Sequence, residues 1–274
     1  MSIRRQRRQQ RPRRPRTALA AACLLPGLLA ACGTSAGSGP SGPPTPTQGT
    51  TLDDPVPTAV ADLPLVDQAG HRFTLASLRG KTVVLTDFLT LCQEICPLTS
   101  VDVEQAARAV AAGGLGDQVV FVEATVDPAR DTVSRLAAYQ KLFPAELFGP
   151  KADWLLATGS AKDLAALWQY FGVSYDKVPE GGDGPPPKDW LTGQPLTFDV
   201  EHQDVVWVIG PDGHRRWEEN GTPDTHGEAP PTPLDRFLSQ TGRDNLAAPG
   251  AQSWSAADVT AAIGYVTGRR LPKP

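Results

Sequence analysis

The chain has 274 residues, with 26 basic and 30 acidic side chains and a formal net charge of −4 at pH 7. Eight of the basic residues are arginines within residues 1–16, so the remaining chain carries 18 basic against 30 acidic residues, a net charge of −12. Proteins that bind nucleic acid usually present a basic patch. The charge balance therefore argues against nucleic acid as a partner.

Residues 1–31 are predicted to be a signal segment that does not belong to the fold. The arginines precede the apolar run 17–31, which is shorter than the roughly 20 residues that a helix needs to span a bilayer. A basic region followed by a short apolar region is typical of a secretory signal. The small residues before Cys32 resemble the lipobox of bacterial lipoproteins. That resemblance implies a lipid on Cys32 and an extracytoplasmic, membrane-anchored bacterial protein; the alternative is an uncleaved N-terminal anchor.

Residues 32–58 are predicted to be a flexible tether, because they are rich in Gly, Ser, Pro and Thr and nearly free of large apolar side chains. Such a segment cannot bury enough surface to offset the entropy lost on ordering. The folded domain is then expected to cover residues 59–274, a length sufficient for one well-buried core.

Within this domain, predicted strands alternate with predicted helices. A hairpin is expected at 62–75, further strands at 82–88, 118–125, 154–158, 205–209 and 214–218, and helices at 97–112, 131–143, 160–171, 232–239 and 256–265. This alternation predicts an α/β fold with a mixed central sheet flanked by helices. The polar stretch 175–194, rich in Gly and Pro, is a long excursion of the kind that is functional or mobile.

Cys92 and Cys96 follow the apolar strand 82–88 and stand at the start of the next helix. Positions i and i+4 share a helix face, so the two sulfurs can converge. Converging thiolates suit Cu(I), and a dithiol can also close to a disulfide. Because Cys23 lies in the signal and Cys32 is the lipid site, this pair holds the remaining free thiols, and exported compartments are usually oxidising. A purely structural disulfide is disfavoured, since so short a loop adds little stability.

Most of residues 59–210 resembles the Sco/SenC family of copper-binding assembly factors for cytochrome c oxidase. The resemblance rests on the element CxxxCP after a strand, on the segment 126–132, and on His202 just before the strand VVWVI. It implies a thioredoxin-like fold with a long loop or hairpin insertion before the histidine. It also implies a copper site of Cys92, Cys96 and His202, and a cytochrome c oxidase subunit with a dinuclear copper centre as the acceptor.

Three positions depart from the family pattern. The family usually has CPDxCP, whereas this chain has Gln93 and Glu94 inside the loop, and Gln203 stands where Ser or Thr is common after the histidine. Gln93 removes a rigid residue, so we expect a more pliable loop, and Glu94 keeps the negative charge. None of the three departures removes a ligand.

Two aspartates and three further histidines are also candidate site residues. Asp127 and Asp131 match the family pattern, and we interpret them as turn-forming or helix-capping residues, with a supporting contact behind the metal ligands as a weaker reading for Asp127. Asp131 and Thr132 are both candidates for the cap of the following helix. His71, His214 and His226 are each predicted to be solvated loop residues. His226 is the alternative third metal ligand if His202 does not bind the metal.

The main alternative function is that of an enzyme, a thiol–disulfide oxidoreductase that reduces the cysteines of the acceptor. It needs Cys92 and Cys96 but no histidine. Peroxide reduction is a third possibility, for which Thr90 is in place, although the i, i+4 spacing fits chelation better. A purely structural lipoprotein would require that removing both cysteines changes stability alone.

Overall fold

A mixed sheet forms the centre of the fold, and the computed structural model describes it over residues 43, 45–149, 152–180 and 185–274. The predicted signal segment, Cys32 and the tether up to residue 42 lie outside these described residues. Within them, nine strands form one sheet in the order β1-β11-β10-β4-β5-β7-β2-β3, with β6 pairing on β7. No helix in the described part of the chain combines the length and apolar character needed to cross a bilayer.

Three parallel strands, β4, β5 and β7, lie side by side, and β10 pairs antiparallel with β4 on the other side. The strands of the sheet are β1 (Thr50–Pro55), β2 (Leu65–Asp67), β3 (Arg72–Phe73), β4 (Thr82–Phe88), β5 (Val119–Thr125), β6 (Phe148–Gly149), β7 (Ala152–Gly159), β10 (Val205–Ile209) and β11 (His214–Asn220). This parallel β-α-β unit, extended by an antiparallel pair, confirms the predicted thioredoxin-like α/β fold.

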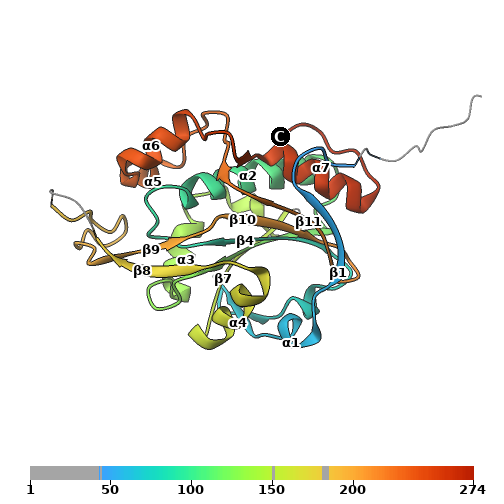
Figure 1. Ribbon diagram of the computed structural model, residues 1–274, viewed down its shortest axis with the longest axis horizontal. Coiled ribbons are helices and arrows are strands. Elements are labelled where there is room, and N and C mark those ends of the chain that lie inside the picture. Colours follow the sequence, from blue (N-terminus) through green and yellow to red (C-terminus); the bar gives the residue numbers. More distant parts are fainter. Residues whose placement is uncertain (1–42, 44, 150–151, 181–184) are drawn as a thin grey trace, which may run out of the picture. The chain divides into compact units, whose positions relative to one another are not determined.

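Every residue of β4 and β5 is buried, as expected of strands covered on both faces. Figure 1 shows α2 and α7 on one face of the sheet and α1 and α4 on the other. The helices are α1 (Thr58–Ala61), α2 (Cys96–Ala112), α3 (Val133–Gln140), α4 (Ala161–Phe171), α5 (Thr232–Phe237), α6 (Gln240–Ala247) and α7 (Ala256–Thr267). Trp154, Trp168 and Trp207 are buried in the core, as predicted.

Helix starts follow local capping chemistry. Pro97 lies in the first turn of α2, where its missing N–H costs nothing. Thr132, and not Asp131, caps α3, because the Thr132 side chain accepts a hydrogen bond from the Arg135 amide. Asp131 is thereby left for a different contact, described below.

The excursion after α4 contains a hairpin that its composition did not reveal. β8 (Tyr175–Pro179) pairs antiparallel with β9 (Phe198–His202) in a separate two-stranded sheet, in which Tyr175 lies opposite His202. The Gly and Pro residues that suggested a loop lie between these strands. The hairpin gives the segment before β10 a regular backbone that ends at His202.

The folded part begins before residue 59, which corrects the predicted boundary of the tether. β1 (Thr50–Pro55) pairs with β11 at the edge of the sheet. Four of its six residues are polar, and ion pairs from Asp53 to Arg216 (2.6 Å) and from Asp54 to Arg215 (2.7 Å) join the two strands. An edge strand exposed on one side needs few apolar side chains, so hydrophobicity did not predict it. Helix α6 and the short parallel pair β12 (Thr222–Pro223) and β13 (Ser253–Trp254) also went unpredicted.

Candidate metal centre

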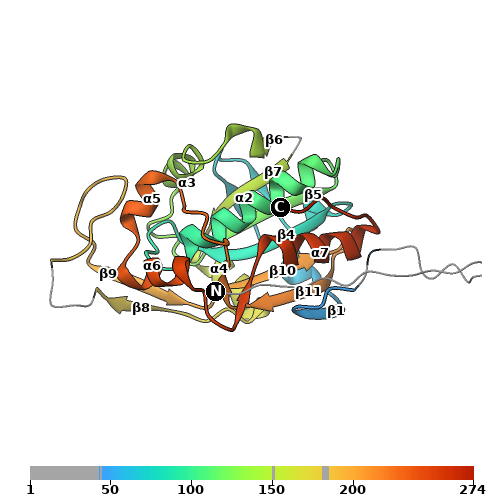
Figure 2. The same ribbon diagram turned by 90° about the horizontal axis from the view of Figure 1, so that it is seen from above.

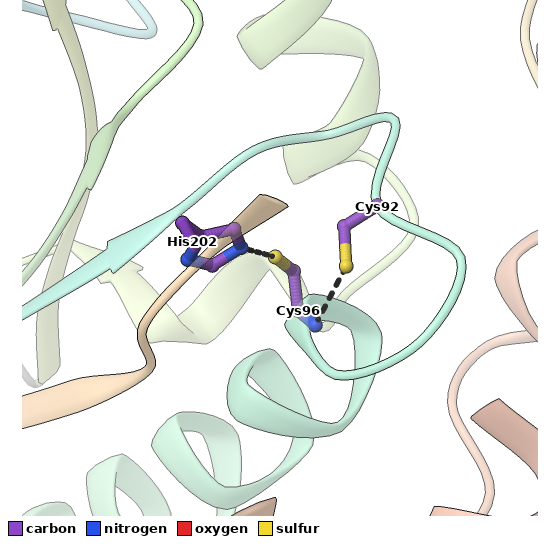
Figure 3. A group of neighbouring side chains, drawn as sticks. All are labelled: Cys92, Cys96 and His202. Carbon is purple, nitrogen blue, oxygen red and sulfur yellow. Dashed lines mark hydrogen bonds between the residues drawn. The ribbon is translucent and has the colours of Figure 1, made fainter. Parts of the chain in front are cut away.

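The loop from Leu89 to Ile95 connects the end of β4 to the start of α2 and carries Cys92, while Cys96 is the first residue of α2. Figure 3 shows the Cys96 sulfur pointing at His202, with the Cys92 side chain beside it on the loop. Among the cysteines that the structure describes, Cys92 and Cys96 are both free and buried. Their positions put two thiol groups at the carboxyl end of a central strand.

His202 completes a group of three candidate ligands. One ligand atom from each of Cys92, Cys96 and His202 lies within 4.8 Å of the other two. The Nε2 atom of His202 is 3.1 Å from the Sγ atom of Cys96. The His202 side chain is only 2% exposed. Residues that are 106 positions apart in the sequence therefore meet because the hairpin β8–β9 brings His202 to the N-terminus of α2.

Asp87 orients the imidazole of His202. One carboxylate oxygen of Asp87 lies 2.6 Å from Nδ1 of His202, and the backbone carbonyl of Gln203 lies 2.7 Å from the same nitrogen. The other Asp87 oxygen accepts the backbone N–H of Val205 at 3.1 Å. Both neighbours of Nδ1 are acceptors, so Nδ1 carries a proton, and Nε2 faces the sulfurs. Carboxylate-bound imidazoles of this kind are typical of metal ligands.

The two thiols have different environments. The Sγ atom of Cys92 accepts the backbone N–H groups of Glu94 (3.5 Å), Ile95 (3.5 Å) and Cys96 (3.4 Å). The hydrogen bond with Cys96 outweighs burial, and His202 adds to it, so the pKa of Cys92 falls well below its ordinary value. Burial and then the neighbouring Cys92 raise the pKa of Cys96 well above its ordinary value. Cys92 is thus the thiolate of the pair, and Cys96 holds a proton that a metal would displace.

The pKa of His202 reflects opposing influences. Burial lowers the pKa of the imidazole, but the hydrogen bonds and negative charges of Asp87 and Cys92 outweigh burial and raise it well above its ordinary value. The imidazole is therefore stabilised in place by negative groups on both of its nitrogens. A bound cation would take the position that the imidazolium proton otherwise holds between Nε2 and the sulfurs.

Asp131 anchors the loop two residues before Cys92. Its carboxylate accepts the Thr90 amide at 3.1 Å and the hydroxyl groups of Thr90 and Thr125, the latter at 2.5 Å. Burial raises the pKa of Asp131 to about 6, against these hydrogen bonds. From the insertion, the indole N–H of Trp190 donates to the Thr90 carbonyl at 2.7 Å. Thr90, predicted as a possible partner of a peroxidatic cysteine, instead uses its hydroxyl to bind Asp131.

A cavity of about 550 Å³ opens onto the site, and both Cys92 and His202 line it. Its wall also holds four acidic residues, Glu94, Glu180, Asp199 and Glu201. Burial, followed by the charge of Cys92, raises the pKa values of Glu94 and Asp199. The opening gives a small solute or a partner side chain a route to the sulfurs, and its acidic wall favours cations over anions.

Asp127 and the three other histidines lie outside the group formed by Cys92, Cys96 and His202. Asp127 forms an ion pair with Arg130, whose guanidinium donates to the Phe198 carbonyl at 2.8 Å, so Asp127 braces β9 at the opposite end from His202. A closer supporting role for Asp127 stays a prediction. His71 and His226 are well exposed beside Asp67 and Asp224. His214 lies in β11 rather than in a loop and pairs with Asp53 at 2.9 Å.

Asp87 is the residue that sequence reasoning missed. The apolar run 82–88 predicts a buried strand, and Asp87 is completely buried within it although it carries a carboxylate. A carboxylate inside an apolar strand is itself a signal, because burying a charge without a partner is costly. The partner could not be read from the sequence, since it lies 115 positions away.

Comparison with known proteins fits this geometry. Residues 54–216 match the SCO1/SenC family, which is more than half of the chain and includes Cys92, Cys96 and His202. The chain belongs to the SCO1/SenC family. The resemblance inferred from the CxxxCP element and from His202 is thereby confirmed.

Individual relatives of this SCO1/SenC protein are distant. It is 32% identical over 154 residues to the mitochondrial SCO2 homologue of Bos taurus, a match that covers 56% of this chain and 50% of the bovine one. It is 29% identical to a Stutzerimonas stutzeri protein that is named for copper binding, over 58% of this chain and 67% of that one. The solved copper-bound ScoI of Arabidopsis thaliana is 25% identical with a TM-score of 0.46, covering 62% of this chain and 88% of that one. The chain spans about half the length of the bovine relative.

Proposed function

We propose that this SCO1/SenC protein binds one copper ion through Cys92, Cys96 and His202. The observation that carries the proposal is the convergence of two sulfurs and one imidazole nitrogen within 4.8 Å. Thiolates and imidazole suit Cu(I), and a further donor would let the same site hold Cu(II). The Stutzerimonas stutzeri relative, named for copper binding, supports the choice of metal.

The surroundings favour loading and release of copper as cargo. Cys92 is already stabilised as a thiolate by its hydrogen bond with Cys96 and by backbone N–H groups, and Asp87 and Gln203 hold Nδ1 of His202 so that Nε2 faces the sulfurs. Copper binding therefore displaces a proton from Cys96 and a proton from Nε2 of His202. A three-coordinate ion reached through the cavity is open to an incoming thiolate, so each new sulfur–copper bond can replace an old one without any electron transfer.

The proposed acceptor is the dinuclear copper centre of a cytochrome c oxidase subunit. This assignment rests on the family resemblance. The proposed location is the extracytoplasmic face of the membrane, with a lipid anchor on Cys32, and this rests on the lipobox-like sequence before that cysteine. In this arrangement the segment before β1 would let the domain reach a membrane-bound acceptor.

The first test is an anaerobic titration of the reduced protein with Cu(I) against a colorimetric chelator. We expect one tightly bound copper, lost in Cys92→Ser and in Cys96→Ser and weakened in His202→Ala. His214→Ala is the matched control, because His214 also pairs with an aspartate but lies on β11. Copper retention by both cysteine variants would overturn the proposal.

A second candidate, thiol–disulfide oxidoreductase, is favoured by the free dithiol and the lowered pKa of Cys92. The Cys92 thiolate would attack a sulfur of the acceptor's disulfide, and Cys96 would then attack Cys92 in the mixed disulfide. The acceptor gains two electrons and two protons, one proton from Cys96 and one from solvent, and a Cys92–Cys96 disulfide forms. In His202→Ala, unchanged reduction of a disulfide substrate together with no copper retention by the wild-type protein would favour this alternative.

A further inference from the structure

A C-terminal segment, residues 232–247, packs on the cysteine loop although it lies beyond the region that matches the family, which ends at residue 216. It consists of α5, the connecting residues Leu238 and Ser239, and α6. Figures 1 and 2 both place α5 and α6 at the end of the sheet where β8 and β9 lie. The family match alone therefore does not describe everything that touches the candidate metal centre.

The contact between this segment and the loop is made by backbone atoms. The N–H of Ser239 donates to the carbonyl of Gln93 at 2.9 Å, one residue after Cys92. Ser239 also caps α6, since its hydroxyl accepts the N–H of Gly242 at 3.1 Å. One residue thus begins the helix and binds the loop.

Gly242 permits this close approach. A Cβ atom at position 242 would lie 2.3 Å from the Gln93 carbonyl oxygen and 3.2 Å from Cα of Glu94. Both neighbours belong to the backbone, so neither can rotate away as a flexible side chain would. Gly242 therefore lacks a side chain where α6 packs directly against the Gln93–Glu94 peptide, and any larger residue would push the two apart.

The peptide that α6 touches belongs to the shell around Cys92. The N–H groups of Glu94, Ile95 and Cys96 point at the Cys92 sulfur. Thr90 is held by Asp131 before the cysteine, and α2 holds Cys96 after it. Gln93 lies between these anchors, buried and lining two cavities of about 550 and 540 Å³. Ser239 and Gly242 supply the contact to the loop at this midpoint.

We propose that residues 232–247 form a clamp that positions the cysteine loop and slows the release of copper, with Ser239 and Gly242 as its positioning residues. The role of the clamp in copper release rests on the proposed function, whereas its effect on the loop does not. Gln93, where the family usually has proline, leaves the loop without that internal restraint. The restraint comes instead from outside the loop, through a hydrogen bond and a backbone contact.

Gly242→Ala tests the contact between α6 and the loop. The higher helix propensity of alanine would stabilise α6, whereas the clash of its Cβ with the Gln93 carbonyl would destabilise the contact. With the contact, α6 or the loop must move. In metal-free protein we expect faster hydrogen exchange at the amides of Glu94, Ile95 and Cys96. In copper-loaded protein we expect transfer of Cu(I) to excess chelator to accelerate roughly tenfold, as for other residues that support metal ligands.

Gly264→Ala is the matched control. A Cβ at Gly264 would lie 2.7 Å from the Arg269 carbonyl oxygen, so the same kind of backbone clash is introduced in a helix. That helix, α7, packs on α2, β4, β10 and β11. Gly264→Ala should lower the melting temperature without changing loop exchange or copper transfer. Equal changes in both variants would overturn the clamp, since they would report general destabilisation.

A second pair of variants isolates the hydrogen bond if Gly242→Ala does not fold. Ser239→Pro removes the N–H that binds Gln93, and the φ of −66° at Ser239 already suits proline. Ser239→Ala removes the hydroxyl cap of α6 but keeps the N–H. The clamp requires faster loop exchange in Ser239→Pro than in Ser239→Ala, and equal exchange would overturn it. If loop exchange responds as expected but the wild-type protein retains no copper, the copper function fails and the positioning contact stands.

Discussion

Replacing Asp87 by asparagine should weaken copper binding without removing any ligand atom. Asp87 accepts two hydrogen bonds with its two oxygens, one from Nδ1 of His202 at 2.6 Å and one from the Val205 amide at 3.1 Å. Asparagine has nearly the same shape but only one side-chain oxygen. Its amide NH₂ group must therefore face one of two donors.

Both orientations of the amide damage the site. If the NH₂ group faces His202, Nδ1 must become the acceptor, and the proton moves to Nε2, the atom that should bind the metal. If the oxygen faces His202, the hydrogen bond loses its charge. Hydrogen bonds to charged groups contribute about 1.5–3 kcal/mol. Loss of one such contact corresponds to roughly 10- to 100-fold weaker metal binding, the range found when carboxylates behind metal-bound histidines are removed.

The assay is anaerobic competition for Cu(I) between the reduced protein and a chelator, with circular dichroism to establish that the variant is folded. Asp53→Asn is the control, because Asp53 also pairs with a histidine, His214, at the exposed edge of the sheet. Its copper affinity should equal that of the wild type. A folded Asp87→Asn protein with wild-type affinity, alongside a weakened His202→Ala, would refute the role assigned to Asp87.

Two further predictions concern stability. Trp190→Phe should lower the free energy of unfolding in urea by at least about 1 kcal/mol, since the indole N–H bond to Thr90 is lost together with part of the packing on Tyr139. Equal stability would contradict the anchoring of the loop by the insertion. Burial raises the pKa of Glu123 from its ordinary value of 4.5 to about 8 in the folded protein. Between these values the unfolded chain has lost the Glu123 proton while the folded protein keeps it, so the stability of the wild type falls as the pH rises. Glu123→Gln keeps an acceptor for Ser100, so its stability relative to the wild type should rise across this window, and parallel pH profiles would contradict the buried, protonated carboxyl.

The central strand, the cysteine loop and the first long helix could be predicted because their signals are local. The apolar run of β4 requires burial on both faces, Pro97 is suited to the first turn of a helix, and Gly113 follows its last residue. Cys92 and Cys96 are four residues apart, but Cys92 lies on the loop before α2, so the two sulfurs converge because the loop folds back on the helix N-terminus and not because they share a helix face. His202 was found through its position before β10 and through family resemblance.

Elements stabilised mainly by distant partners were missed. β1 and β8 consist largely of polar residues, and they are strands because β11 and β9 pair with them. Helix α6 is also polar on most of its surface, and its buried residue is a glycine, which periodicity does not count as apolar. In each case backbone atoms make part of the stabilising contact, and the partner residues lie far away in the sequence, so local side-chain composition does not reveal it.

From the sequence we predicted an export signal at the N-terminus, the α/β class, and the three residues proposed to bind copper. The tertiary structure alone decided how those residues are held: Asp87 by its bond to His202, Asp131 by its bonds to Thr90, and Gly242 by its contact with Gln93. Which residues can bind a metal depends on the chemistry of their side chains, and the sequence states that directly. The positioning of ligands depends on which buried groups meet across long stretches of chain, and only folding brings those groups together.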